Sequence, residues 1–122
     1  QLGEGMNAEE LKVRTKQFAL RVMKLVDALP NTIAGRAIAN QLMRSASSVG
    51  ANYRAACRGR STAEFIAKLS IVVEESDESC FWLELIMESG LLPVDQVKDL
   101  QQEAEEITAI MTASRKTARS NK

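Results

Sequence analysis

The chain has 122 residues and a mass of 13.4 kDa, which suits one domain with one hydrophobic core and leaves too little for a second. Hydrophobic residues make up 45% and charged residues 26%, a balance that argues against disorder throughout the chain. The formal net charge is zero, which argues against the uniformly basic surface of a typical nucleic-acid-binding domain.

The two halves of the chain nevertheless differ strongly in charge. Residues 1–60 hold ten Lys or Arg against four Asp or Glu, whereas residues 61–122 hold six against twelve. Such halves can attract each other within one fold, or they can leave a basic face on a neutral molecule.

The first residues of the chain and its cysteines bear on the cellular compartment of the protein. We expect residues 1–5, Gln-Leu-Gly-Glu-Gly, to be a cloning remnant ahead of a native start at Met6. Cys57 and Cys80 are too few for a disulfide framework, and nothing resembles a secretory signal, so we predict a cytoplasmic protein. No apolar run approaches the roughly 18 residues of a spanning helix, so we expect no membrane contact.

The first two predicted helices lie on either side of Pro30. From Ala8 to Leu29, apolar residues recur at steps of three, four and seven, which is one face of a helix, and Pro30 with Asn31 ends it. A second helix is predicted from about Thr32 to Cys57. Much of its inward stripe is small, which favours close approach of a neighbour: Ile38, Leu42, Ser45, Val49, Asn52 and Ala56.

The third and fourth predicted helices follow a break at residues 58–60. Ser61 and Glu64 have the spacing of a capping box, and Gly90 is a predicted C-terminal stop. Pro93 suits the start of the last helix, whose apolar stripe ends at Met111. We therefore expect a bundle over residues 6–114 and a polar, basic and frayed tail over residues 115–122. Four amphipathic helices with short turns predict an all-α, antiparallel up-down-up-down four-helix bundle.

The sequence contains few of the residue patterns on which common catalytic sites depend. The chain has no histidine, which removes the usual catalytic triads, imidazole zinc sites and the ligands of di-iron bundles. We predict no catalytic residue, no metal and no cofactor, and hence no enzyme. The acidic run Glu74–Glu78, with Glu84 and Glu88 further along, could hold a hard cation, but one helix face supplies too few oxygen ligands, and a solvated face or a set of salt-bridge partners is the stronger interpretation.

A hairpin of the second and third helices gives several arginines internal partners. If the turn is centred near residue 60, residues whose numbers sum to about 120 lie at the same height. Arg44 then lies beside Glu75 and Glu78, and Arg36 lies near Glu84, while Asn52 is a further structural polar residue. Such pairs would fix the register of the two helices.

Three other arginines gather at the predicted turn. Arg54, Arg58 and Arg60 have few acidic neighbours in the sequence. With basic residues of the first helix nearby, namely Arg14, Lys16 and Arg21, they could form a patch that contacts phosphates. The alternative is a solvated turn without a ligand.

Three segments also show a family resemblance. They are Arg44-Ser-Ala-Ser-Ser-Val-Gly-Ala-Asn52, Glu64-Phe-Ile-Ala-Lys-Leu69 and Phe81-Trp-Leu-Glu-Leu85. The sequence resembles, over nearly all of residues 8–112, the bacterial four-helix-bundle proteins related to the 23S rRNA intervening-sequence protein, and it is similar to the accessory protein of diversity-generating retroelements. The resemblance implies a non-enzymatic bundle that assembles as a ring-like homopentamer, with nucleic-acid binding attributed to some relatives. After Asn52, Tyr-Arg-Ala-Ala replaces the family's usual apolar residue, alanine, acid and glycine, which makes this turn more basic.

Two functional hypotheses remain at this point. The first is an oligomeric bundle that binds RNA or DNA through the basic turn. The second is a structural or protein-interaction module without nucleic-acid binding, which the two adjacent apolar stripes of the third predicted helix favour, because one core face requires only one of them.

Overall fold

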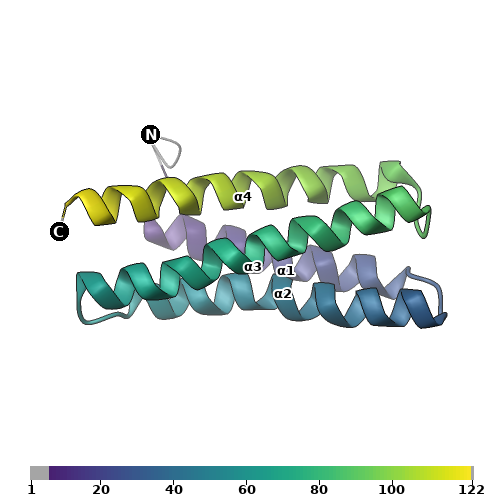
Figure 1. Cartoon of the computed structure of the whole chain (residues 1–122), viewed down its shortest axis with the longest axis horizontal. Helices are drawn as coiled ribbons and strands as arrows, with labels where there is room; N and C mark the ends of the chain where they lie inside the picture. The colour runs from purple at the N-terminus through teal and green to yellow at the C-terminus, as the bar shows by residue number, and fades with distance from the viewer. Residues whose placement is uncertain (1–5, 122) are drawn as a thin grey trace.

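Four helices make up the part of the chain that the structure describes (Figure 1). In a computed structural model that describes residues 6–121, the helices are α1 (Ala8–Asp27), α2 (Ile33–Cys57), α3 (Thr62–Ser89) and α4 (Val94–Ser120). The all-α prediction is confirmed. The expectation for residues 1–5 lies outside the described residues. Within residues 6–121, none of the helices has the length of apolar sequence that crossing a bilayer requires.

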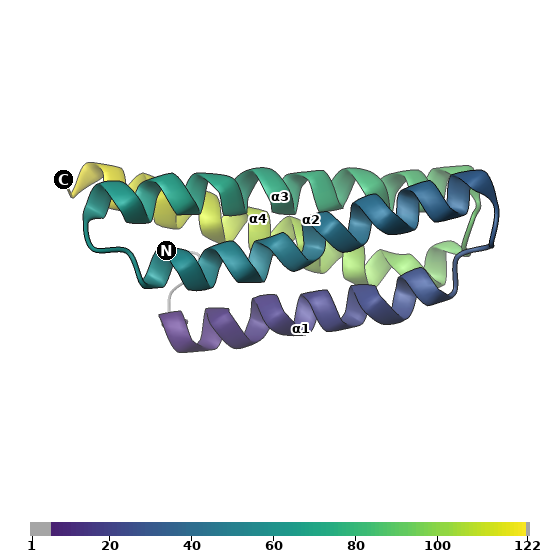
Figure 2. The same cartoon turned by 90° about the horizontal axis from the view of Figure 1, so that it is seen from below.

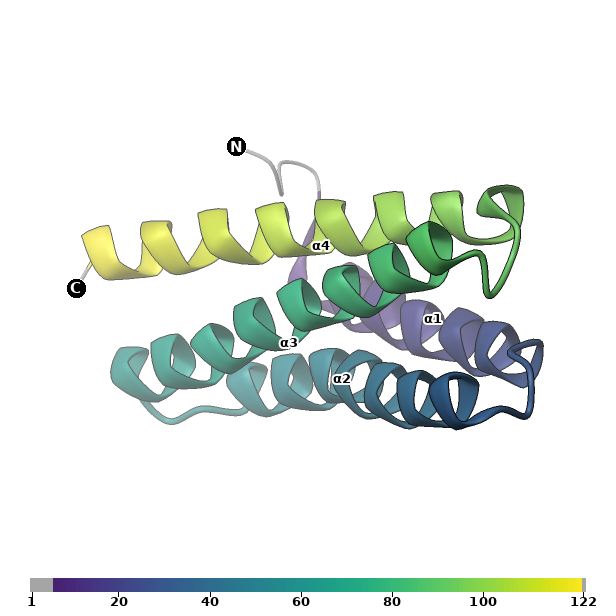
Figure 3. The ribbon, with the colours of Figure 1, turned by 45° about the vertical axis from the view of Figure 1, so that its right-hand side comes forward.

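Consecutive helices run antiparallel and pack side by side, which gives the predicted up-down-up-down bundle (Figures 1 and 2). α3 packs extensively on both α2 and α4, whereas α1 packs mainly on α2 and touches α4 much less. Figure 3 shows α1 at the back of the bundle. The inward stripes of all four helices meet in one core, whose largest fully buried side chains include Phe18, Leu42, Leu69, Leu83, Ile86, Ile107 and Met111.

Side-chain caps fix the first residues of α1, α2 and α3, whereas α4 has no side-chain cap. Asn7 and Glu10 form a reciprocal capping box at the start of α1, which the sequence prediction missed. At α3 the predicted box is only half formed: the Ser61 side chain accepts from the Glu64 backbone N–H, but the Glu64 carboxylate accepts from the N–H of Arg60. Gly90 ends α3 with φ of 75°, a left-handed conformation that glycine adopts without steric cost.

The small residues of α2 allow the close packing that the sequence predicted. Ser45 and Ser79 are fully buried and their hydroxyl oxygens lie 2.9 Å apart across the α2–α3 contact. On the other side of α3, Thr108 donates to Ser76 Oγ at 2.9 Å. Each of these hydroxyl groups also bonds a backbone carbonyl of its own helix, so the buried polar atoms are satisfied.

The end of α4 differs from the expectation. The frayed tail predicted from residue 115 is wrong, because α4 continues to Ser120. Arg115 reaches α3 and donates to Ser70 Oγ at 3.4 Å. The segment 115–120 consists largely of residues that tolerate or favour a helix, so loss of the apolar stripe after Met111 does not end the helix.

Candidate nucleic-acid interface

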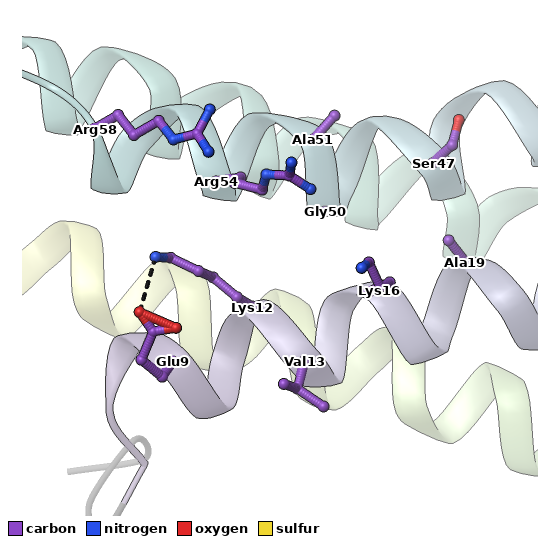
Figure 4. Close-up of a pocket in the computed structure, with 10 residues that line it drawn as sticks. All are labelled: Glu9, Lys12, Val13, Lys16, Ala19, Ser47, Gly50, Ala51, Arg54 and Arg58. Carbon is purple, nitrogen blue, oxygen red and sulfur yellow. Dashed lines mark hydrogen bonds and ion pairs between the residues drawn. The ribbon is translucent and has the colours of Figure 1, made fainter.

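A groove with a volume of about 570 Å³ lies between α1 and α2 (Figure 4). Its walls carry four cationic side chains, Lys12 and Lys16 from α1 and Arg54 and Arg58 from α2. Each pair is spaced by four residues, which places its two members one above the other on the same face of a helix. The groove is therefore lined with positive charge from both sides.

The floor of the groove is made of small and apolar residues. Val13 and Ala19 come from α1, and Gly50 and Ala51 come from α2. A side chain added at Gly50 would lie 3.5 Å from the backbone carbonyl of Thr15, so the two helix backbones approach closely here. The antiparallel register set by that approach brings the Lys12 turn level with Arg54.

Few carboxylates offset the charge of the groove. Lys12 donates to Glu9 at 3.1 Å, which is the acidic residue of the lining (Figure 4). Lys16, Arg54 and Arg58 form no ion pair with any residue of the described range 6–121. α2 contains no Asp or Glu at all. An anion that entered the groove would thus meet cations that the fold itself leaves uncompensated.

The structure separates the five arginines that the sequence grouped together. Arg54 and Arg58 meet in the groove, whereas Arg60 lines a distinct hollow near the end of α4, beside Phe65 and Ala118. Arg21 lines another hollow, between α1 and α4, beside Asp99.

Arg14 was predicted to lie near the basic turn, and the structure places it elsewhere. It points to α4, where its Nε and Nη2 donate to Glu103 at 2.7 and 2.8 Å, and Nη2 also donates to Glu106 at 2.8 Å. The hydrogen bonding that Arg14 donates to Glu103 is the main cause that raises the pKa of Arg14. A hydrogen bond donated by Gln102 and the contact with Arg14 lower the pKa of Glu106. Arg14 therefore ties α1 to α4 and takes no part in the groove.

Lys12 is the groove residue that the sequence prediction missed, while Lys16 was expected near the patch. The hairpin argument used for the second and third helices does not find Lys12. Folding about Pro30 pairs residues whose numbers sum to about 60 and so places Lys12 opposite Ser48, whereas Gly50 meets Thr15 in the structure, a register that brings Lys12 level with Arg54.

The predicted polar pairs between α2 and α3 are partly confirmed. Arg44 donates to both carboxylate oxygens of Glu75 at 3.1 Å and to Glu78 at 2.6 Å. A hydrogen bond from Trp82 Nε1 and the contact with Arg44 lower the pKa of Glu78.

The predicted pair of Arg36 and Glu84 needs correction, whereas Asn52 is a structural polar residue as expected. Arg36 does not reach Glu84, because it donates instead to Asn31 Oδ1 at 2.9 Å in the preceding turn. Glu84 accepts a hydrogen bond from Gln101 of α4 at 3.2 Å. Asn52 bonds within its own helix, donating to the backbone and side-chain oxygens of Ser48.

Comparison with known proteins places the chain in a family. A family model described as 23S rRNA-intervening sequence protein matches residues 9–113. The chain belongs to this family.

One solved structure supports the same assignment. It is a protein with unknown function from the S23 ribosomal protein family of Bacteroides thetaiotaomicron, 31% identical in sequence. The superposition has a TM-score of 0.80 and covers 86% of this chain and 97% of the other. A comparison with curated proteins found no match.

Two buried titratable groups of the core, Cys80 and Tyr53, are held in their neutral forms. Burial raises the pKa of the Cys80 thiol to about 11, so it is a neutral thiol at physiological pH. Tyr53 is buried, and its desolvation raises its pKa as well. Across residues 6–121 no group of three or more acidic or sulfur ligands is placed to hold a metal ion.

Proposed function

We propose that this protein is a non-enzymatic homo-oligomer that binds nucleic acid electrostatically through the groove between α1 and α2. The observation behind the proposal is the convergence of Lys12, Lys16, Arg54 and Arg58 on one groove, three of them without an ion-pair partner in residues 6–121. Lys and Arg are the residues that contact phosphate oxygens, and two arginines on one wall can each bind a phosphate bidentately.

The groove chemistry favours the phosphate backbone over the bases. No aromatic side chain lines the groove, so it offers no platform for base stacking. Contacts of this kind position a nucleic acid without reading its sequence. The family description names an rRNA, and structured RNA is therefore the first ligand to test, with duplex DNA as the second.

The test is a fluorescence anisotropy titration of labelled structured RNA and duplex DNA at several NaCl concentrations. We expect the logarithm of the association constant to fall linearly with the logarithm of salt concentration. The double variant Arg54→Ala, Arg58→Ala should bind more weakly to every sequence and lower the salt slope by about two, one for each lost phosphate contact.

Arg36→Ala is the matched control, because Arg36 lies on α2 at the end of the helix away from the groove. It should bind as the wild type does. The proposal fails if the wild type does not bind at low salt, or if Arg36→Ala loses as much affinity as the groove variant.

A second candidate is a protein-interaction module that does not bind nucleic acid. It is favoured by large apolar side chains on the surface, among them Leu20, Met23 and Phe81, each close to half exposed. Sedimentation equilibrium tests the assembly that both candidates share, for which the family resemblance implies a pentamer. A strict monomer at all accessible concentrations would contradict the homo-oligomer in either candidate.

A further inference from the structure

α1 has a second stripe of apolar residues on the side that faces away from the core. Val13, Leu20 and Met23 are 60%, 44% and 50% exposed, and the exposed Lys16 lies between them. Steps of three and four residues separate these four positions, so they form one continuous line on the helix, here called the α1 outer stripe. The core face of α1 is formed by other residues, Leu11, Thr15, Phe18 and Val22.

α3 has an outward line of the opposite charge. Glu74, Asp77, Phe81, Glu84 and Glu88 are all exposed and also follow steps of three and four residues. Phe81, half exposed, gives this α3 acidic stripe an apolar centre. In the described residues Glu74, Asp77, Glu84 and Glu88 have no cationic partner.

The two stripes cannot meet within one molecule. α1 and α3 occupy opposite corners of the bundle, since each packs on α2 and α4 and not on the other. Figure 2 shows α1 along the lower edge of the molecule and α3 along the upper edge. Because each stripe lies opposite the core face of its own helix, the two stripes face opposite sides of the bundle.

The stripes match each other in the ways that two helices need in order to pack. Both have the alternating three and four spacing with which side chains of one helix insert between those of another. Each stripe has exposed apolar side chains. The α1 outer stripe carries the cation Lys16, and the α3 acidic stripe carries several carboxylates of opposite charge. The same opposition holds for the whole molecule, in which residues 6–60 carry ten cations and three acids and residues 61–121 carry five cations and twelve acids.

We propose that the α1 outer stripe of one copy packs against the α3 acidic stripe of a second copy. The proposal rests on the homo-oligomer part of the proposed function and specifies which faces join. It buries Leu20, Met23 and Phe81 and places Lys16 among carboxylates. Since each copy uses two different faces, the contact is heterologous, and repeating it gives either a closed ring or an open chain of subunits.

Charge exchange between the stripes tests the contact directly. Lys16→Glu places a carboxylate against the acidic stripe, and the double variant Asp77→Lys, Glu84→Lys places cations against the α1 outer stripe. We expect each variant alone to associate at least about tenfold more weakly, because like charges then face each other. The variant that carries all three substitutions should recover the sedimentation coefficient of the wild-type assembly, because every contact, in a ring of any number of subunits, again joins opposite charges.

Apolar variants give a second measure. Leu20→Ser and Phe81→Ser should each weaken association, whereas Ile33→Ser should not, because Ile33 is 82% exposed but belongs to neither stripe. Circular dichroism on each variant checks that the bundle is folded. Failure of the triply substituted, charge-exchanged variant to reassemble, or equal weakening by Ile33→Ser, would overturn the proposal.

The wild-type measurement separates this proposal from the one on which it rests. A monomeric wild type contradicts the homo-oligomer itself. A wild type that assembles, together with stripe variants that assemble equally well, contradicts only the assigned faces. The nucleic-acid part is measured separately, by anisotropy on variants of Arg54 and Arg58.

Discussion

At the scale of single residues, Arg44 shows how a charged group can fix helix register. Its guanidinium bridges Glu75 and Glu78 of α3, and Glu78 also accepts from Trp82 at 3.0 Å. The arginine is about half exposed, with 48% of its side chain accessible, so we expect the network to contribute only about 1 kcal/mol or less. Its main effect is to select one alignment of α2 on α3.

The lowered pKa of Glu78 predicts a pH dependence of stability. A carboxylate whose folded pKa lies below its ordinary value, about 4.3, stabilises the protein above that value and loses its contribution as pH falls through the folded pKa. We therefore expect urea unfolding between pH 6 and pH 3 to show a smaller loss of stability in Glu78→Gln than in the wild type. Asp27→Asn, which removes an exposed acid outside the network and outside the α3 acidic stripe, should follow the wild type. A parallel loss in Glu78→Gln and the wild type would contradict this assignment.

At the scale of helices, the sequence predicted what depends on local patterns. Periodicity and breaks gave α1 to α3 to within two residues, because each ends at a proline, a cap or a glycine. Which helix face meets which neighbour is not local information. Arg14 was therefore grouped with the basic turn although it faces α4, and Lys12 was missed although it faces Arg54. Arg54 and Arg58 could be predicted because they adjoin the turn itself, and Lys16 was expected near them, so Lys12 is the groove cation that the prediction lacked.

Substitution by alanine should change the stability of the protein in opposite directions at two glycines of α2. A Cβ at Gly35 would lie 2.0 Å from the carbonyl oxygen of Pro30, so Gly35→Ala must shift the turn between α1 and α2 and should destabilise the protein by roughly 1–3 kcal/mol. At Gly50 the nearest atoms lie at an ordinary 3.5 Å, so Gly50→Ala should stabilise by up to about 1 kcal/mol through helix propensity. Urea unfolding measures both. Equal signs for the two variants would contradict the packing described here.

At the scale of the whole molecule, neutrality conceals two oppositely charged halves, and the two proposals use the basic half differently. Nucleic acid would contact the groove wall formed by Arg54 and Arg58 on α2, whereas a second copy would cover Leu20 and Met23 further along α1. Val13 and Lys16 belong to both surfaces. The proposals can therefore be separated by substitutions that touch one surface, the other, or both.

Three variants, each measured in two assays, make that separation testable. Arg58→Ala should weaken binding to a short duplex that spans a single groove and leave the sedimentation coefficient unchanged, because Arg58 lies outside the α1 outer stripe. Leu20→Ser should do the reverse, since a short duplex gains nothing from multivalency. Lys16→Ala should weaken both, lowering the salt slope of duplex binding by about one. Dissociation of the assembly by Arg58→Ala would show that the groove itself lies at the subunit contact, and nucleic acid and a second copy would then compete for it.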